Sequence, residues 1–213
     1  MPNPFDGRAE RYDAWYEKPF GRSVYALELE CLRSLFNPAG RALEVGVGTG
    51  RFAAPLGVKY GVDPSLDMLR LARRRGLLVV RGYGEALPFK AASFDAVLLI
   101  VTLCFVRKPE LVLKEAYRVL KRGGRLYLAL ILKETRWADH YLKKARAGHP
   151  IYRHARFFSF DELKKLWQGY FTLERVKSVE IREVQDEREV KEAELVDGFN
   201  ESSAFTCLRL KRV

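Results

Sequence analysis

The chain has 213 residues, a mass of 24.5 kDa, an apolar share of 48% and a formal net charge of +11, which suits one globular domain and leaves room for an anionic partner. The longest apolar run, Ala96 to Val106, is too short to span a bilayer, and the first residues lack the apolar segment of a secretory signal. Cys31, Cys104 and Cys207 form no C-x-x-C pair, so they indicate neither a metal site nor a disulfide scaffold and favour reduced thiols in the cytoplasm.

Two helical segments are predicted at the start of the chain. Arg8–Lys18 alternates charged and aromatic residues, and Pro19 ends this segment. Apolar residues recur at helical spacing in Ser23–Phe36, and Asn37-Pro38 is a helix stop. We expect residues 1–38 to form a helical cap on the core.

The middle of the chain alternates strands and helices. We predict strands near 41–46, 58–62, 77–81, 94–101 and 124–132, and helices near 50–56, 66–75 and 108–121. This alternation predicts an α/β fold with a Rossmann-like, doubly wound and mostly parallel sheet. Such sheets bind ligands at the carboxyl ends of their strands, near the point where the strand order reverses.

A long connection follows the fifth predicted strand. Residues 133–156 are too many for a tight turn and are rich in aromatic and histidine side chains. We predict a helical insertion that acts as a lid over the active site. Ser159 and Glu162 then form the sequence signature of a capping box, which marks the start of a further helix.

The last third of the chain returns to the sheet. Residues 170–181 are predicted to form strand six, and residues 204–211 a seventh strand that returns antiparallel. The densely charged residues 182–194 between them indicate a solvated hairpin extension or a mobile loop. No repeat or second domain is evident, so we expect residues 1–213 to form one domain.

A glycine-rich turn follows the first predicted strand. Glu44 precedes Gly46, Gly48 and Gly50, and the next strand ends in Asp63. Glycine has no Cβ and lets the backbone approach a ligand, and a carboxylate at that strand end can accept both hydrogen bonds of a ribose diol. The pattern therefore predicts a pocket for a nucleoside.

The details of this turn argue against a dinucleotide. The dinucleotide fingerprint has its third glycine one position after Gly50, where this chain carries Arg51. A carboxylate such as Glu44 is a poor neighbour for a pyrophosphate but suits an ammonium or sulfonium group. The P-loop motif that cradles phosphates does not occur in the sequence.

Several co-linear motifs resemble the class I S-adenosylmethionine (SAM)-dependent methyltransferases. They are Glu44-x-Gly46-x-Gly48-x-Gly50, Gly61-Val62-Asp63-Pro64-Ser65-x-x-Met68-Leu69, Gly82-x-x-Glu85-Ala86-Leu87-Pro88-Phe89, Ser93-Phe94-Asp95-Ala96-Val97, and the run from Val112 through Glu115 and Arg118 to Gly123-Gly124. The match extends from about residue 41 to about residue 132. It most resembles the small-molecule type typified by the ubiquinone and menaquinone biosynthesis methyltransferases. The resemblance implies SAM as cofactor, S-adenosylhomocysteine (SAH) as product and a small-molecule methyl acceptor.

The same resemblance implies a set of cofactor-binding residues. Glu44 and the glycine turn would hold the methionine part, and Asp63 the ribose. Met68 and Gly84 would contact the adenine, and Ile100 would lie under the sulfonium. The predicted set is Tyr16, Glu44, Gly46, Val47, Gly48, Thr49, Gly50, Asp63, Pro64, Met68, Tyr83, Gly84, Glu85 and Ile100, with no metal ligand. Tyr83 departs from the Asp or Asn that relatives often carry.

The sequence does not identify a catalytic base. Where many relatives have paired histidines after strand four, this chain has Cys104 and Phe105. A base is required only when the nucleophile must lose a proton. The remaining candidates are Tyr16, His140, His149 and His154. We expect Tyr16 to touch the cofactor, and Trp137 or Tyr152 to face the acceptor.

Two other functions stay open. An RNA methyltransferase would suit the basic charge and the cluster Arg70, Arg73, Arg74 and Arg75, although a solvated helix face explains that cluster more simply. The sequence lacks the Asn-Pro-Pro-aromatic and Pro-Cys or Thr-Cys motifs of base methylation. The other alternative is a non-catalytic SAM-binding protein. The many charged residues and few uncharged amides indicate a thermophilic source.

Overall fold

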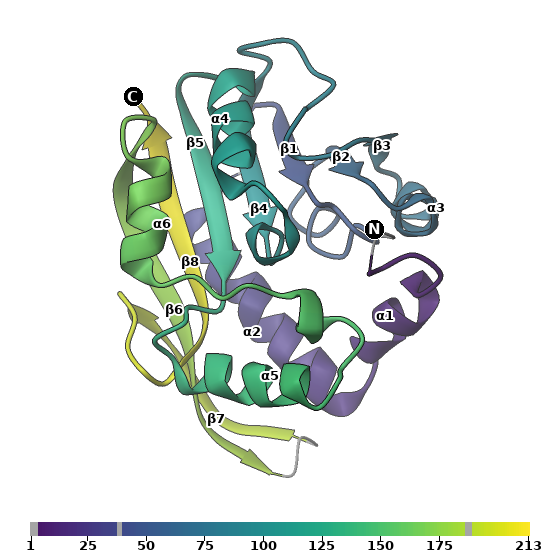
Figure 1. Ribbon diagram of the computed structural model, residues 1–213, viewed down its shortest axis with the longest axis vertical. Helices are drawn as coiled ribbons and strands as arrows, with labels where there is room; N and C mark the ends of the chain where they lie inside the picture. The colour runs from purple at the N-terminus through teal and green to yellow at the C-terminus, as the bar shows by residue number, and fades with distance from the viewer. Residues whose placement is uncertain (1–3, 38–39, 186–188) are drawn as a thin grey trace.

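One sheet organises the fold. The computed structural model describes residues 4–37, 40–185 and 189–213, and within them eight strands follow the order β3-β2-β1-β4-β5-β8-β6-β7 (Figure 1). The strands are β1 (Ala42–Val45), β2 (Tyr60–Asp63), β3 (Leu78–Arg81), β4 (Phe94–Ile100), β5 (Leu120–Leu130), β6 (Phe171–Gln185), β7 (Glu189–Asp197) and β8 (Ser203–Arg212). The helices are α1 (Ala9–Trp15), α2 (Pro19–Leu35), α3 (Leu66–Arg74), α4 (Pro109–Val119), α5 (Arg136–Arg146) and α6 (Phe160–Trp167), with 3-10 turns η1 (Leu103–Phe105) and η2 (Tyr152–His154).

The strand order reverses between β1 and β4. From β1 the chain moves outward to β2 and β3, then crosses to β4 and β5, and all five strands are parallel. β8 lies antiparallel between β5 and β6, and β7 pairs antiparallel with β6. This topology confirms the predicted Rossmann-like, doubly wound α/β fold with an antiparallel last strand. Ligands of such sheets bind where the order reverses, beyond the carboxyl ends of the strands.

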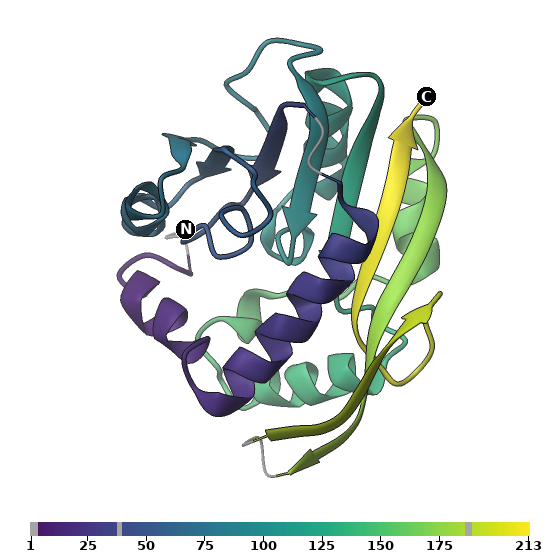
Figure 2. The same cartoon turned by 180° about the vertical axis from the view of Figure 1, so that it is seen from behind.

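Helices cover both faces of the sheet. α2 crosses one face, whereas α4 and α6 lie on the other (Figures 1 and 2). Leu29 and Leu32 of α2 belong to the hydrophobic cluster on the first face. Leu113 of α4 and Leu163 of α6 belong to the cluster on the second face. Burial on both faces explains why β1 and β4 are apolar along most of their length.

A layer of short helices lies across the carboxyl ends of the parallel strands. α1 and the first turns of α2 come from the N-terminal segment, and α5 and η2 come from the segment after β5 (Figures 1 and 2). The predicted insertion at 133–156 is therefore helical. Of the expected cap at 1–38, residues 1–3 and 38 lie outside the described residues. Among the described helices, none has both the length and the apolar character needed to cross a membrane.

The helix predicted at 50–56 is wrong. Residues 51–57 form a series of turns instead. Pro55 has no N–H to donate to the carbonyl of Arg51, and that oxygen accepts the Tyr25 hydroxyl at 2.6 Å. Gly50 and Gly57 have φ of +81° and +73°, which a helix cannot continue through. The proline and the two glycines therefore replace a helix with a compact loop.

The other element boundaries differ in smaller ways. α2 begins at Pro19, because proline fits the first turn of a helix, and the expected stop at Pro38 lies outside the described residues. The Ser159–Glu162 capping box is confirmed, with both of its hydrogen bonds present. The charged segment 182–194 continues β6 and returns as β7, which confirms a hairpin extension, although residues 186–188 lie outside the described residues.

Candidate functional site

The glycine-rich turn after β1 presents an open backbone surface. Gly46, Gly48 and Gly50 have φ of +74°, +51° and +81°. A Cβ on Gly46 would come within 2.3 Å of the Thr102 hydroxyl oxygen, and one on Gly50 within 2.4 Å of a Leu77 methyl carbon. A Cβ on Gly48 would meet no atom within 4 Å. Packing therefore requires two of these glycines, whereas Gly48 borders space that a ligand can enter.

Two buried carboxylates flank this turn. The Asp63 carboxylate accepts the Gly48 N–H at 3.0 Å and the Ser65 N–H at 2.9 Å. Burial raises the pKa of Asp63 to about 6, despite these hydrogen bonds. Glu44 is only 2% exposed, and burial, with the nearby Asp63 charge, raises its pKa well above its usual range. Among the described residues, no group donates a hydrogen bond to the Oε2 atom of Glu44.

The remaining predicted cofactor residues lie in the glycine turn itself or at and after the ends of the neighbouring strands. They are Val47, Thr49, Pro64, Met68, Tyr83, Gly84, Glu85 and Ile100. Ile100 is buried at the end of β4, and Met68 is buried beneath the N-terminal segment, against Ala9. Tyr83 is 63% exposed, and Glu85 accepts the backbone N–H of Arg107. All of these residues lie at the carboxyl edge of the sheet, as the strand order requires.

An aromatic pair in the N-terminal segment consists of a buried Tyr16 and a half-buried Tyr12. Tyr16 follows α1 and is 7% exposed, and its hydroxyl is 2.9 Å from the hydroxyl of Tyr12. Burial raises the pKa of Tyr12 to about 12 and raises the pKa of Tyr16 well above its usual range. Charge on Glu28 adds to both shifts, and charge on Glu44 adds to that of Tyr12. Tyr12 is thus close to both Glu28 and Glu44.

Asp13 ties α1 to the glycine-rich turn. Its carboxylate accepts the Thr49 hydroxyl at 2.7 Å, the Arg51 Nε at 2.9 Å and an Arg75 nitrogen at 2.8 Å. Burial alone would raise the pKa of Asp13, but the hydrogen bonds from both arginines and Thr49 outweigh it and lower that pKa to about 2. The sequence analysis missed Asp13, because its partners lie at separations of 36 to 62 residues.

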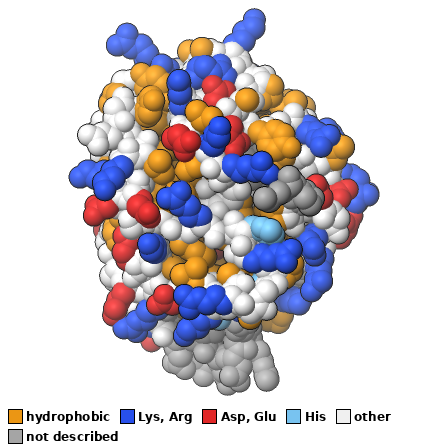
Figure 3. Space-filling view, in the orientation of Figure 1, with side chains coloured by type: hydrophobic (Ala, Val, Ile, Leu, Met, Phe, Trp, Pro, Cys, Tyr) orange, Lys and Arg blue, Asp and Glu red, His pale blue; other side chains and the backbone are white. Residues whose placement is uncertain are grey.

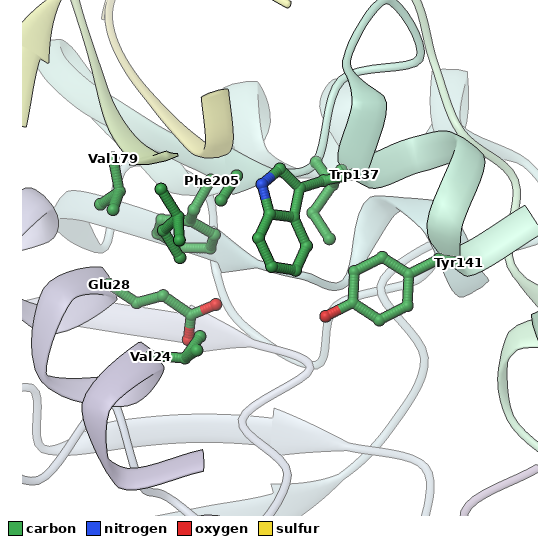
Figure 4. Close-up of a pocket in the computed structure, with 9 residues that line it drawn as sticks. Val24, Glu28, Trp137, Tyr141, Val179 and Phe205 are labelled. Atoms are coloured by element: carbon green, nitrogen blue, oxygen red, sulfur yellow. The ribbon is translucent and has the colours of Figure 1, made fainter. Parts of the chain in front are cut away.

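A second pocket lies between α2, α5 and the ends of β6 and β8 (Figure 4). Its walls are Val24, Glu28, Ile131, Trp137, Tyr141, Val179, Ile181, Ala204 and Phe205. Most of these side chains are apolar or aromatic, and Glu28 brings a carboxylate among them. Burial raises the pKa of Glu28 to about 8. Glu28 is not among the residues predicted from the sequence. A signal was present, because Glu28 lies four residues after Val24 and four before buried Leu32, and a charged residue is unusual on such an apolar helix face.

The catalytic candidates fall in different environments. Tyr16 is buried near Glu28, and Trp137 contributes to the pocket wall. His140 makes an edge-on ring contact with Trp137 at 5.9 Å between centroids. His154 is exposed and its Nε2 accepts a hydrogen bond from Arg153. His149 stacks on Tyr152, and burial lowers its pKa.

Comparison with known proteins identifies the class. The family described as Methyltransferase domain matches residues 43–128. A crystal structure of a SAM-dependent methyltransferase from Thermotoga maritima, described as a possible histamine N-methyltransferase, has 38% sequence identity and a TM-score of 0.88. The similarity covers 98% of this chain and 97% of that one. The chain therefore belongs to the SAM-dependent methyltransferases, which confirms the cofactor class predicted from the sequence.

Relatives also include longer proteins. The uncharacterized protein Rv2003c of Mycobacterium tuberculosis is 49% identical over 159 residues, which are 74% of this chain and 56% of that protein. This chain thus matches only about half the length of that relative. The ubiquinone/menaquinone biosynthesis C-methyltransferase UbiE of Rhizobium meliloti is 34% identical over 137 residues, 55% of this chain and 53% of UbiE. This match confirms the resemblance to the quinone-biosynthesis methyltransferases.

Proposed function

We propose that this protein transfers the methyl group of SAM to a small-molecule acceptor held under the layer of α1, α5 and η2. One observation carries the proposal. Where the strand order reverses, the open glycine turn lies between two buried carboxylates, Glu44 and Asp63. The Glu44 Oε2 atom has no donor among the described residues and can accept hydrogen bonds from the ammonium of the methionine part. Gly48 allows close backbone approach, and Asp63 can accept hydrogen bonds from the ribose diol.

In this proposal the protein acts mainly by positioning. SAM supplies a methyl group that is already activated by its sulfonium, so the chain has to align the acceptor and exclude water. The Asp13 hydrogen bonds hold α1 against the glycine turn, and the Tyr12 and Tyr16 hydroxyls hydrogen-bond to each other. We infer that α1 together with residues 133–156 forms the lid over the reacting groups.

A small acceptor suits the second pocket better than RNA does. The pocket walls are mostly apolar and aromatic side chains, which suit an organic molecule, but the cavity has a volume of only about 10 Å³, so the layer of α5 and η2 has to open for an acceptor to enter. Lys and Arg side chains are scattered among acidic and apolar ones on the face seen in Figure 3, without a single basic stripe. Arg70 pairs with Glu10 and Arg75 with Asp13, so half of the α3 arginine cluster binds α1. The relatives' names mention carbon and nitrogen acceptors, so they do not decide the acceptor atom.

The test combines binding with methyl transfer. Calorimetric titration with SAM, SAH and NAD should give binding of the first two only. Labelled SAM should then transfer its methyl group to compounds in a small-molecule extract and leave total RNA unlabelled. Labelled RNA would favour the alternative acceptor, and binding without any transfer would favour a non-catalytic protein. Binding of NAD in place of SAM would refute the proposal.

A further inference from the structure

Glu28 is a carboxylate in apolar surroundings. It lies on the face of α2 that packs over β6 and β8, beside Val24, Val179 and Phe205 (Figure 4). Its carboxylate and the Tyr141 hydroxyl both point into the space between α2 and α5 (Figure 4). Within the described part of the chain, no ion pair or hydrogen bond to the Glu28 carboxylate is present. Glu28 is thus a half-buried carboxylate that lines the pocket.

This placement disfavours the ionised form of Glu28 unless a ligand stabilises it. An ionised carboxylate that leaves water without a cation or a donor loses several kcal/mol of hydration. Burial is the sole cause of the raised pKa of Glu28, and no basic side chain offsets it. A leucine or glutamine would satisfy the packing of α2 without this cost. Titratable groups with pKa values shifted by desolvation inside a pocket are characteristic of functional sites.

The walls around Glu28 suit a cation. Aromatic rings attract cations placed over their faces, and the attraction is stronger away from water. Trp137, Tyr141 and Phe205 line the pocket with Glu28. Tyr12 and Tyr16 lie close enough for the Glu28 charge to raise the pKa values of both. A carboxylate surrounded by aromatic rings is a site for an organic ammonium group.

We propose that Glu28 recognises the methyl acceptor of this protein and that the acceptor is a small molecule carrying a protonated amine. This inference rests on the proposed methyl transfer and adds the class of acceptor and the residue that selects it. The two sites are connected through α2: the Tyr16 ring packs edge-on against Tyr25 at 5.4 Å between centroids, and the Tyr25 hydroxyl donates to the Arg51 carbonyl beside the glycine turn. The amine would bind beside α2 with its nitrogen directed past the tyrosine pair toward the cofactor, because in-line transfer needs the nitrogen within about 3–3.5 Å of the methyl carbon.

Glu28 also supplies a place for the proton that the amine must lose. An alkylammonium has no free electron pair on nitrogen, so it cannot attack a methyl group. The Glu28 carboxylate takes one proton from the ammonium, and the freed nitrogen pair forms the new N–C bond while the S–C bond of SAM breaks. The S–C electron pair stays on sulfur, the methylated nitrogen carries the positive charge, and Glu28 later releases its proton to water. A pKa of about 8 brings Glu28 nearer to the usual ammonium value of about 10.

Several other titratable groups lie near Glu28. They are Tyr12 and Tyr16 at the N-terminal segment, Tyr141 on α5, Tyr152 in η2, and the thiols of Cys31 on α2 and Cys207 on β8. Burial raises the pKa values of Tyr12, Tyr16, Tyr152 and Cys207, so these four groups stay neutral near pH 8. A titration near pH 8 in amine methylation is therefore assigned to Glu28 where the Glu28→Gln substitution removes it.

The decisive experiment compares Glu28→Gln with Glu30→Gln. Glutamine keeps the shape of Glu28 and removes its charge, and Glu30 is an exposed residue of the same helix. Each protein is first titrated with SAM and SAH by calorimetry. The SAH-loaded proteins are then titrated with 2-phenylethylamine, tryptamine and 1,4-diaminobutane, and with 2-phenylethanol as a neutral control. Methyl transfer from labelled SAM to the same four compounds is measured between about pH 6 and pH 10.

We expect all three proteins to bind SAM equally. The wild-type protein and Glu30→Gln should bind at least one amine, prefer it to 2-phenylethanol, and methylate it with a rate that rises through about pH 8. Glu28→Gln should bind that amine at least about tenfold more weakly, the loss expected for one charge-assisted hydrogen bond, and should lose the pH dependence. Equal amine binding by Glu28→Gln, or transfer only to neutral acceptors, would overturn the role of Glu28. Failure of the wild-type protein to bind SAM would instead overturn the proposed function.

Discussion

Replacing Asp63 with asparagine should weaken SAM binding by about tenfold to a hundredfold. The ribose diol would lose a charged acceptor, and hydrogen bonds to charged groups contribute about 1.5–3 kcal/mol net. Asparagine keeps one carbonyl oxygen but turns an NH2 group toward the second backbone donor, either the Gly48 or the Ser65 N–H. The shape of the site is preserved, so the lost affinity measures the charge and the missing acceptor.

The pH dependence gives a second measure of the same carboxylate. Its pKa in the folded protein is about 6, above the ordinary value of 3.8. Binding requires the ionised form, so wild-type affinity should rise between about pH 5 and pH 7 and then level off. Because the folded-state pKa is raised, ionisation of Asp63 removes stability as pH rises from about 4 to about 6, by about 3 kcal/mol in total. The Asp63→Asn substitution removes that cost and adds one poorly paired donor, so the folded stability should change little.

The assay is calorimetric titration with SAH across this pH range, with thermal unfolding recorded for each protein. Asp161→Asn is the matched control, because Asp161 is exposed at the start of α6, away from the glycine turn. The control should keep both the affinity and the pH dependence of the wild-type protein. If Asp63→Asn binds SAH with wild-type affinity at every pH, Asp63 does not hold the ribose and the assigned cofactor geometry is wrong.

Three further predictions concern the turn and the lid. Gly48→Val should abolish SAM binding while the protein still folds. Gly123→Val is the control: it carries the same positive-φ strain of about 1–2 kcal/mol, also has open space around it, and should bind SAM normally. Calorimetry and thermal unfolding compare the two variants. Asp13→Ala should destabilise the fold by about 1.5–3 kcal/mol at neutral pH, because Arg75 loses its carboxylate partner and Arg51 keeps only Glu17. The wild-type advantage should vanish as pH falls toward about 2, where Asp13 protonates; chemical denaturation measures both. SAH should increase hydrogen-exchange protection in residues 8–22 and, more weakly, in 133–156, and protection confined to the glycine turn would contradict a lid.

The local sequence decided the core of the fold. Apolar strands alternating with amphipathic helices dictate a buried parallel sheet, because both of its faces must be covered. The positions of Glu44, Gly48 and Asp63 could be predicted because each follows directly from a strand end. Prediction failed at residues 50–56, where Pro55 and the flanking glycines outweigh an apolar pattern typical of a helix.

Tertiary structure decided what those strand ends face. Asp13 binds Thr49, Arg51 and Arg75 only because α1 folds back over the turn, and no local pattern encodes that contact. The sequence places Glu28 among the apolar residues of a helix, but it does not show what surrounds that carboxylate. Its surroundings come from α5, β6 and β8, which lie more than a hundred residues further along the chain. Local propensity follows from neighbours in sequence, whereas burial of a charge depends on distant segments that meet only in the folded protein.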